Sequence, residues 1–146
     1  MFSQEVRSVM EHKKLLTAPP ETTVSSAARL MANRMVGAVM VVEDLKLVGI
    51  FTERDAVFRV LAHGLNPETT RLAEVMTPSP LTIGPDKSFG VALLMMYENG
   101  FRHVPVIENG ELIGIVSARN ALDPDLEEFT SESERRKQIV RERAKT

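Results

Sequence analysis

A hydroxyl residue and an acidic residue lie three positions apart in the segment Gly49–Asp55, which reads GIFTERD. Thr52 ends an apolar run and Asp55 follows one helical turn later, so the pattern predicts a buried strand that passes directly into a helix. Free amide donors and the positive end of the helix dipole favour a phosphate at such a helix start. The same spacing is also typical of a capping box, in which the two side chains only stabilise the helix end.

The pattern returns 65 residues later in Gly114–Asn120, which reads GIVSARN, with Ser117 at the hydroxyl position and Asn120 at the acidic one. The shift of 65 holds without an insertion from position 16 to position 122, and upstream of position 16 the register slips by one. A capping box alone does not explain why seven residues recur at this distance. The repeat predicts a duplicated β-α-β-β-α unit.

Apolar runs and turn residues predict the elements that position these motifs. In the first unit we expect an extended piece at 15–18, a helix capped by Thr22 or Thr23 and ended by Gly37, strands at 38–42 and 47–51, and a helix at 53–62. In the second unit we expect an extended piece at 81–83, a helix from Asp86 to Gly100, strands at 103–107 and 112–116, and a helical turn up to 122.

The Asn109-Gly110 pair predicts a tight hairpin turn between the last two strands. Outside the repeat, residues 3–12 are predicted as a short amphipathic helix, and Asp123-Pro124 is predicted to start a charged helix. We therefore place domains at 8–64 and 65–122, with lead-in and linker at 65–74, and a charged C-terminal helix or tail at 123–146.

Composition limits the classes of function. A formal net charge of −2 over 146 residues offers no basic surface for nucleic acid or for an anionic membrane. Cysteine is absent, which excludes disulfides and thiolate chemistry, and the three histidines are too scattered to predict a metal site. No nucleophile–base pair or carboxylate dyad is visible, so we do not expect an enzyme. The first residues lack the apolar run of a signal peptide, and we expect a cytoplasmic protein.

The duplicated unit resembles the cystathionine-beta-synthase-type (CBS) domain, and the chain resembles a tandem CBS pair, or Bateman module. The resemblance is carried by Gly49–Asp55 with the preceding Val39–Val42, and by His103–Ile107 and Gly114–Asn120 in the second half. It implies an α/β (α+β) fold of two subdomains related by pseudo-two-fold symmetry, with the sheets packed together and the helices outside.

The resemblance also implies an adenosine-containing ligand (AMP, ADP or ATP, or else NAD or S-adenosylmethionine) in clefts between the two halves. On this basis Asp55 accepts hydrogen bonds from the ribose hydroxyls and Thr52 donates to the phosphate. Arg102 and His103 are expected to reach that phosphate from the other half. Adenine is expected near Thr17 and Ala18, against an apolar wall of Gly37, Ala38 and Val39. The remaining expected ligand contacts are Arg54, Thr82, Ile83, Pro105, Ser117, Arg119 and Asn120.

The two copies of the motif are not equivalent. Asn120 lacks the charge of the ribose-binding acid, and the positions that match Arg102 and His103 in the first half hold Gly37 and Ala38. We therefore predict one good nucleotide site at Asp55 and a weak or altered one at Asn120. For Arg54 and Arg119 the alternative to ligand contact is a solvated side chain or an ion pair with glutamate.

The expected role is a regulatory sensor that binds an adenine nucleotide and signals to a partner protein. The alternative is a dimerisation scaffold that binds no ligand. Both hypotheses include a homodimer formed through exposed apolar helix faces. The charged tail is either a solvated helix or a helix that packs on a partner.

Overall fold

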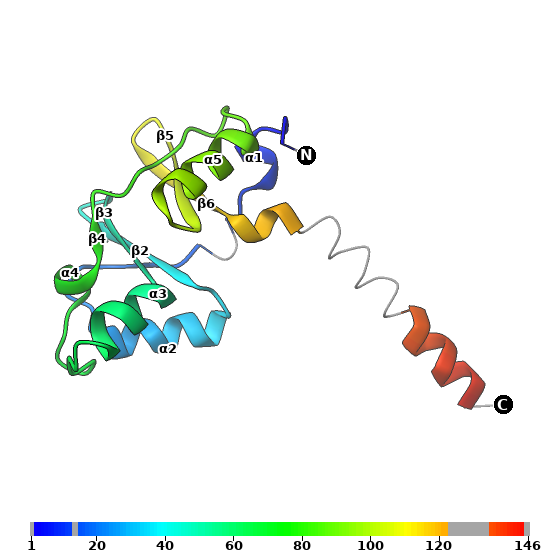
Figure 1. The fold of residues 1–146 in the computed structure, drawn as a ribbon, viewed down its shortest axis with the longest axis horizontal. Helices are drawn as coiled ribbons and strands as arrows, with labels where there is room; N and C mark the ends of the chain where they lie inside the picture. Colours follow the sequence, from blue (N-terminus) through cyan, green and yellow to red (C-terminus); the bar gives the residue numbers. More distant parts are fainter. Residues whose placement is uncertain (1, 13–14, 123–134, 145–146) are drawn as a thin grey trace.

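The computed structural model describes residues 2–12, 15–122 and 135–144, and its main body consists of two halves built on the same plan (Figure 1). The first half contains β1 (Thr17–Ala18), α2 (Val24–Arg34), β2 (Ala38–Glu43), β3 (Lys46–Thr52), α3 (Glu53–Asp55) and the π-helical η1 (Ala56–Leu61). The second half contains α5 (Phe89–Asn99), β5 (His103–Glu108), β6 (Glu111–Ser117) and the 3-10 helix η2 (Ala118–Leu122). The predicted α/β fold of two repeated subdomains is confirmed.

Each half is built around an antiparallel hairpin. In the first half the strand order is β1-β2-β3-β4, where β1 runs parallel to β2 and β4 is Thr77–Pro78. In the second half the hairpin β5-β6 is flanked by single bridges, from Ile83 to Val106 and from Glu11 to Ile115. The start of each first strand pairs with the hydroxyl residue that ends the second, Ala38 with Thr52 and His103 with Ser117. The register thus places both motifs at equivalent sheet ends.

The segments that precede the two halves are exchanged between them. Helix α1 (Val6–Val9) precedes the first half but lies beside α5 of the second, and α4 (Leu72–Val75) with β4 precedes the second half but packs on the first (Figure 1). Equivalent backbone hydrogen bonds hold both, with Val6 N donating to Lys87 O and Leu72 N to Thr22 O, each at 2.8 Å. Each half is therefore completed by a segment that lies outside its own repeat.

This exchange explains the glycine in each motif. A Cβ atom on Gly49 would lie 2.3 Å from Sδ of Met76, and one on Gly114 would lie 2.9 Å from Sδ of Met10. Both methionines belong to the exchanged segments, and a separation under 3.0 Å requires something to shift. The glycines make room for protein side chains.

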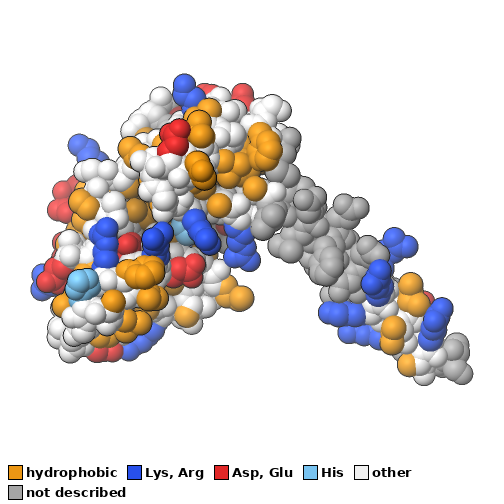
Figure 2. All heavy atoms as spheres, in the orientation of Figure 1, with side chains coloured by type: hydrophobic (Ala, Val, Ile, Leu, Met, Phe, Trp, Pro, Cys, Tyr) orange, Lys and Arg blue, Asp and Glu red, His pale blue; other side chains and the backbone are white. Residues whose placement is uncertain are grey.

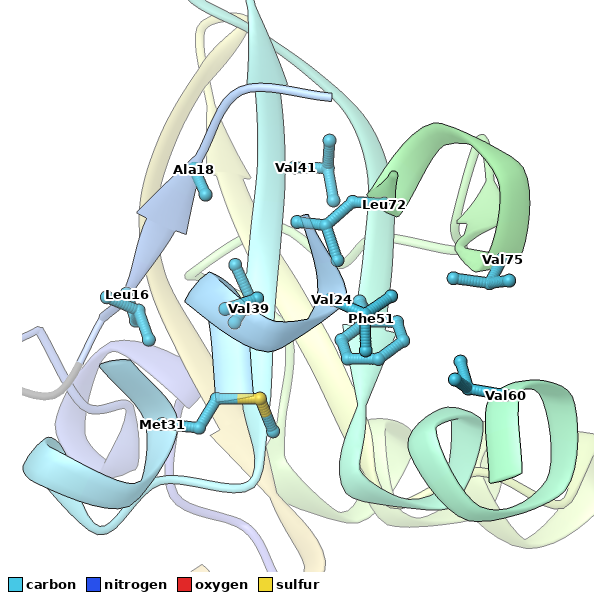
Figure 3. Packing of buried hydrophobic residues seen from close by; sticks show 11 residues of the cluster. Leu16, Ala18, Val24, Met31, Val39, Val41, Phe51, Val60, Leu72 and Val75 are labelled. Atoms are coloured by element: carbon cyan, nitrogen blue, oxygen red, sulfur yellow. The ribbon is translucent and has the colours of Figure 1, made fainter. Parts of the chain in front are cut away.

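Three buried clusters form the core, one within each half and one between the two halves. In the first half, α2, η1 and α4 pack on one face of the sheet, as Figure 3 shows for Val24, Val60 and Leu72 around Phe51. An equivalent cluster around Phe89 lies between α5 and the β5-β6 hairpin. A third cluster, which includes Ala38, Met40 and Ile115, joins the two sheets face to face. The helices consequently cover the outside and the two motifs meet across the interface between the sheets.

Several local predictions differ from the structure. The second long helix is capped by Ser88, whose hydroxyl accepts from Val91 N, and not by Asp86. The first long helix ends at Met35, which has a left-handed φ of 55° and lies two residues before the predicted Gly37. In the predicted extended piece at 81–83, only Ile83 pairs with a strand, through a single parallel bridge to Val106.

Helix lengths differ as well. The predicted helix at 3–12 is limited to α1, and the predicted helix at 53–62 is a short α3 followed by the π-helical η1. The predicted Asn109-Gly110 turn is confirmed, with φ of 52° and 81° at its two residues. Residues 135–144 form a helix, and the predicted helix start at Asp123-Pro124 lies outside the described residues.

Candidate functional site

The motif of the first half forms a reciprocal capping box. Thr52 N and Thr52 Oγ1 donate to Oδ2 of Asp55 at 2.9 and 3.2 Å, and Asp55 N donates to Thr52 Oγ1 at 3.3 Å. Only 12% of the Asp55 side chain is exposed. Its other oxygen, Oδ1, lies 3.4 Å from Nε of Arg59. The capping interpretation is thus confirmed, and Oδ1 is the carboxylate oxygen that the cap does not use.

The motif of the second half has a similar box with a different outer atom. Ser117 N and Ser117 Oγ donate to Oδ1 of Asn120 at 2.7 and 3.3 Å. The amide nitrogen of Asn120 donates to Oε1 of Glu11 at 3.3 Å. Where the first half presents a carboxylate oxygen, the second half presents an amide donor that is bound to a carboxylate from the exchanged segment.

A cavity of about 1020 Å³ opens beside the first box, and we call it the Asp55 cavity. Thr52 and Asp55 of the first half line it, together with Arg102 and His103 of the second half. Arg54 also lines it, with Nη1 donating to Gly100 O at 3.2 Å and its guanidinium 5.3 Å from the centre of the Phe58 ring. Its remaining wall consists of Ile50, Glu53, Val57, Phe58, Arg59, Thr77, Pro80, Leu81, Asn99, Gly100 and Phe101.

A smaller cavity of about 410 Å³ opens beside the second box, and we call it the Ser117 cavity. Its polar lining includes Glu11, Ser117 and Arg119. Its apolar lining consists of Met35, Val36, Gly37, Ala38, Ile115 and Ala118. Both volumes are of the size that small-molecule sites take, about 300–1,000 Å³.

Glu53, Arg102 and His103 form a wall that the two cavities share. Figure 2 shows Lys and Arg side chains gathered along the boundary between the two halves, with acidic and His side chains among them. Burial lowers the pKa of His103 below its ordinary value of 6.5, and Arg102 lowers it further, while Glu53 and Glu11 act in the opposite direction. The shared wall therefore favours a neutral imidazole between charged neighbours.

The structure distributes the predicted site residues over both cavities. Thr52, Arg54 and Asp55 line the Asp55 cavity, Ser117 and Arg119 line the Ser117 cavity, and Arg102 and His103 line both. Gly37 and Ala38 were expected beside Asp55, but they line the Ser117 cavity. The face-to-face sheets explain this, because they bring the start of β2 against the end of β6 and place Ala38 and Ile115 in one cluster.

Other predicted residues line neither cavity. Ala18 and Val39 are buried in the core of the first half, Ile83 lies in that of the second, and Pro105 is buried. Thr17 and Thr82 are exposed away from both cavities, and Asn120 is buried and reaches Glu11.

Sequence reasoning missed Glu11, Arg59 and Phe58. The repeat gave no signal for Glu11, because it lies upstream of the point where the register slips. Arg59 and Phe58 follow the motif within one further helical turn, so helical periodicity was the signal that could have found them.

Two negative findings apply to the described residues. Among them, no group of three or more His, Cys, Asp or Glu side chains could hold a metal ion. No helix in the same part of the chain has the length and apolar character to cross a bilayer.

Comparison with known proteins identifies the family. The family model for the CBS domain matches residues 6–62 and 72–125, so the chain belongs to the CBS domain family and carries two CBS domains in tandem. The chain is 41% identical over 110 residues to the CBS domain-containing protein CBSCBSPB3 of Arabidopsis thaliana. That match covers 75% of this chain, which spans about 20% of the length of the Arabidopsis protein.

Solved structures show the same fold. An uncharacterized conserved protein from Pyrococcus horikoshii matches with a TM-score of 0.79 at 29% identity, over 86% of this chain and 94% of that one. The CBS domain protein PAE2072 from Pyrobaculum aerophilum, complexed with AMP, matches with a TM-score of 0.72 at 24% identity, over 80% and 89%. The CBS domain pair of protein MJ0100, in complex with 5′-methylthioadenosine and S-adenosyl-L-methionine, matches with a TM-score of 0.75 at 22% identity, over 86% and 98%.

Proposed function

We propose that this chain is a regulatory module that binds an adenosine-containing nucleotide in the Asp55 cavity and signals the bound state to a partner protein. The observation that carries the proposal is the arrangement of the cavity. It sets Oδ1 of Asp55, which the capping box does not use and which lies beside Arg59, in a cavity that Arg102 of the other half also lines. A ribose diol donates hydrogen bonds and a phosphate accepts them, so the cavity offers partners for both parts of a nucleotide.

The charge of the Asp55 cavity favours an anionic ligand. Arg54, Arg59 and Arg102 line it, against the carboxylates of Glu53 and Asp55. Arginine is suited to phosphate because its planar fork can donate two parallel hydrogen bonds. Two structural relatives are complexed with AMP and with S-adenosyl-L-methionine, and both ligands contain adenosine. Of these two, the excess of arginine favours AMP, because the sulfonium of S-adenosylmethionine is cationic.

Ligand binding at this place would couple the two halves. The cavity takes Thr52 and Asp55 from the first half and Arg102 and His103 from the second. A ligand shifts the arrangement of two bodies only as far as it binds one arrangement more tightly than the other. A nucleotide that contacts both halves would favour the arrangement in which Asp55 and Arg102 both reach it, and its loss would remove that preference.

A thermal-shift panel with AMP, ATP, NAD and S-adenosylmethionine tests the proposal. A ligand that binds only the folded state stabilises it by mass action, by about 2.7 kcal/mol when the free ligand concentration is one hundred times the Kd. The melting temperature rises accordingly. We expect AMP or ATP to give the largest shift and inorganic phosphate to give a much smaller one. No shift with any of the four at millimolar concentration would instead support the ligand-free scaffold.

Exposed apolar side chains support a homodimer as part of the same proposal. Leu94 and Tyr97 on α5 are 54% and 86% exposed, and Val57, Phe58 and Leu61 on η1 are each more than half exposed. A second copy of the chain is the occupant that we propose for these faces. Light scattering should show a dimer for the unchanged chain and a monomer for the Leu94→Glu variant. A monomeric unchanged chain would contradict the dimer.

A further inference from the structure

The formal net charge of −2 is unevenly distributed along the chain. Residues 135–144 read RRKQIVRERA and form a helix, which we call the basic helix, in which five side chains are Lys or Arg and one is Glu. This helix carries a formal charge of +4 and leaves −6 for the rest of the chain. Figure 2 shows its Lys and Arg side chains gathered around apolar ones. The overall charge predicted no basic surface, and this helix is a local exception.

An apolar pair lies in the middle of the basic helix. Ile139 and Val140 are 46% and 65% exposed. Residues three and four positions apart share a helix face, so Arg136 and Arg143 lie on the face of this pair, one turn to either side. Arg141 lies on the opposite face, because each residue turns the helix by about 100°. The helix thus presents an apolar centre with a charged rim, as protein interfaces do.

The basic helix takes no part in the core of the two halves. All ten of its residues are exposed, and none of them lines the Asp55 cavity or the Ser117 cavity. The three buried clusters of the described residues contain no residue of this helix. Burial of the apolar pair against a partner would remove it from water, which favours association.

The charge of the basic helix is complementary to an acidic partner. Four of its five cations are arginines, whose planar fork donates paired hydrogen bonds to carboxylates. Complementary charge steers the encounter and fixes the register of two surfaces, whereas a desolvated apolar centre supplies most of the affinity. The surface that fits is an acidic helical segment whose apolar side chains pack on Ile139 and Val140.

Other anionic partners fit these residues less well. A helix that lies in a membrane surface needs a broad apolar face with Trp, Phe or Leu, and the basic helix has only two larger apolar residues, both β-branched. A nucleic acid is a long polyanion that the charge of −6 on the rest of the chain repels. In a second copy of the chain, Glu68, Asp86 and Glu108 already pair with arginines of that same copy.

We propose that the basic helix is a docking surface for an acidic helical segment of another protein. Apolar side chains of that segment pack on Ile139 and Val140, and its carboxylates bind Arg136 and Arg143. The inference rests on the proposed function in that the regulated protein is the occupant. Because the helix lies outside both cavities, partner binding and nucleotide binding can be measured separately.

Isothermal titration of the full chain with a synthetic helical peptide tests the inference. The peptide carries two adjacent leucines with glutamates one turn to either side, and a second peptide carries serines in place of the leucines. The leucine peptide should bind one site per chain, and the serine peptide at least about tenfold more weakly. Arg136→Glu should weaken the leucine peptide at least about tenfold, because it reverses a charge on the apolar face.

Arg141→Glu is the matched control, because it makes the same charge change on the opposite face. It should weaken the leucine peptide by about threefold or less. Circular dichroism checks that the two variants have equal helix content. Equal losses of affinity in the two variants would show attraction by charge alone and overturn the inference.

Two further outcomes concern the other occupants. Tighter binding of a double-stranded oligonucleotide or of phosphatidylserine vesicles than of the leucine peptide would overturn the inference. A dimer that Arg136→Glu converts into a monomer in light scattering would also overturn it, because a second copy then occupies the helix. Failure of the leucine peptide to bind overturns the inference alone when AMP still raises the melting temperature, whereas the absence of an AMP shift contradicts the proposed function.

Discussion

The Asp55 cavity and the Ser117 cavity contain similar groups that come from different segments. In both, the last motif residue accepts from the backbone N and the hydroxyl of the residue that ends the strand, and Arg102 and His103 line the wall. The carboxylate belongs to the motif in the Asp55 cavity and to the exchanged segment in the Ser117 cavity. The two halves therefore place a carboxylate beside the motif from different segments of the chain. A comparison of the two motifs alone would judge the second site to be damaged.

The largest effect is expected when the first motif is converted into the second. Asp55→Asn keeps an oxygen that can accept from Thr52 N but removes the charge that strengthens hydrogen bonds to a ribose diol. A hydrogen bond to a charged group contributes about 1.5–3 kcal/mol, so AMP should bind the Asp55 cavity roughly 10–100-fold more weakly. Isothermal titration measures this change.

A second substitution then tests whether the supplier of the carboxylate can be exchanged. Thr77 occupies the position that corresponds to Glu11, so Thr77→Glu on the Asp55→Asn background should restore part of the lost affinity. The control for the charge lost in Asp55→Asn is Asp86→Asn, because the Asp86 side chain is 77% exposed and lies outside both cavities. If Asp55→Asn binds AMP as tightly as the unchanged chain, the carboxylate has no part in ligand binding.

The next effect concerns the glycines that receive the exchanged methionines. An added Cβ would lie 2.3 Å from Sδ of Met76 at Gly49 but 2.9 Å from Sδ of Met10 at Gly114. Overpacking of this kind costs about 1–3 kcal/mol, so Gly49→Ala and Gly114→Ala should each lower the free energy of unfolding by about that amount. At Gly114 the added Cβ would also lie 3.1 Å from the backbone oxygen of Glu11, which cannot turn aside as a methionine side chain can. Gly84→Ala is the control, because nothing lies within 4 Å of a Cβ there. Urea denaturation of the three variants measures the losses, and a loss at Gly49 or Gly114 no larger than that at Gly84 would contradict the prediction.

These glycines also show how far the sequence could be interpreted. The repeat of 65 residues predicted both hairpins and the capping boxes, because apolar periodicity and a hydroxyl at a helix start are local signals. It did not predict that Met76 and Met10 pack on the motif glycines, because the exchange of lead-in segments is a long-range property. Glu11 was missed for the same reason.

The structure places the predicted site residues at the ends of the hairpin strands on the cavity walls and those within the strands in the core. Arg102 and His103 were expected to face the Asp55 site, and the structure places them on the wall of that cavity. Val39 was expected in the apolar wall and Ala18 as a backbone contact near the adenine, and the side chains of both are buried in the core of the first half. The direction of a side chain from a short strand depends on register, which the sequence pattern leaves open when apolar residues are continuous.

A smaller effect separates the arginines of the two cavities. Arg102 lines both cavities, whereas Arg54 lines only the Asp55 cavity and Arg119 only the Ser117 cavity. Pairs of exposed charges contribute roughly 1 kcal/mol at most. Each arginine-to-methionine substitution should therefore weaken AMP binding about fivefold or less at the cavity that the arginine lines. Titrations should show both sites weakened in Arg102→Met and one in each of the others. Loss at a single site in Arg102→Met would show that the wall is not functionally shared.

The smallest effect is expected from His103 on the shared wall. Burial lowers its pKa below 6.5, with Arg102 adding to this and Glu53 and Glu11 opposing it, so the folded state binds a proton less readily than the unfolded state. The contribution of His103 to stability is therefore complete above pH 6.5 and is lost as the pH falls through the lowered pKa. His103→Gln should reduce the fall in melting temperature over this range, and the exposed His63 provides the control variant His63→Gln. Saturating AMP should also reduce the fall, because a phosphate favours the protonated imidazole. If it does so in Glu11→Gln but not in Asp55→Asn, His103 serves the Asp55 cavity alone.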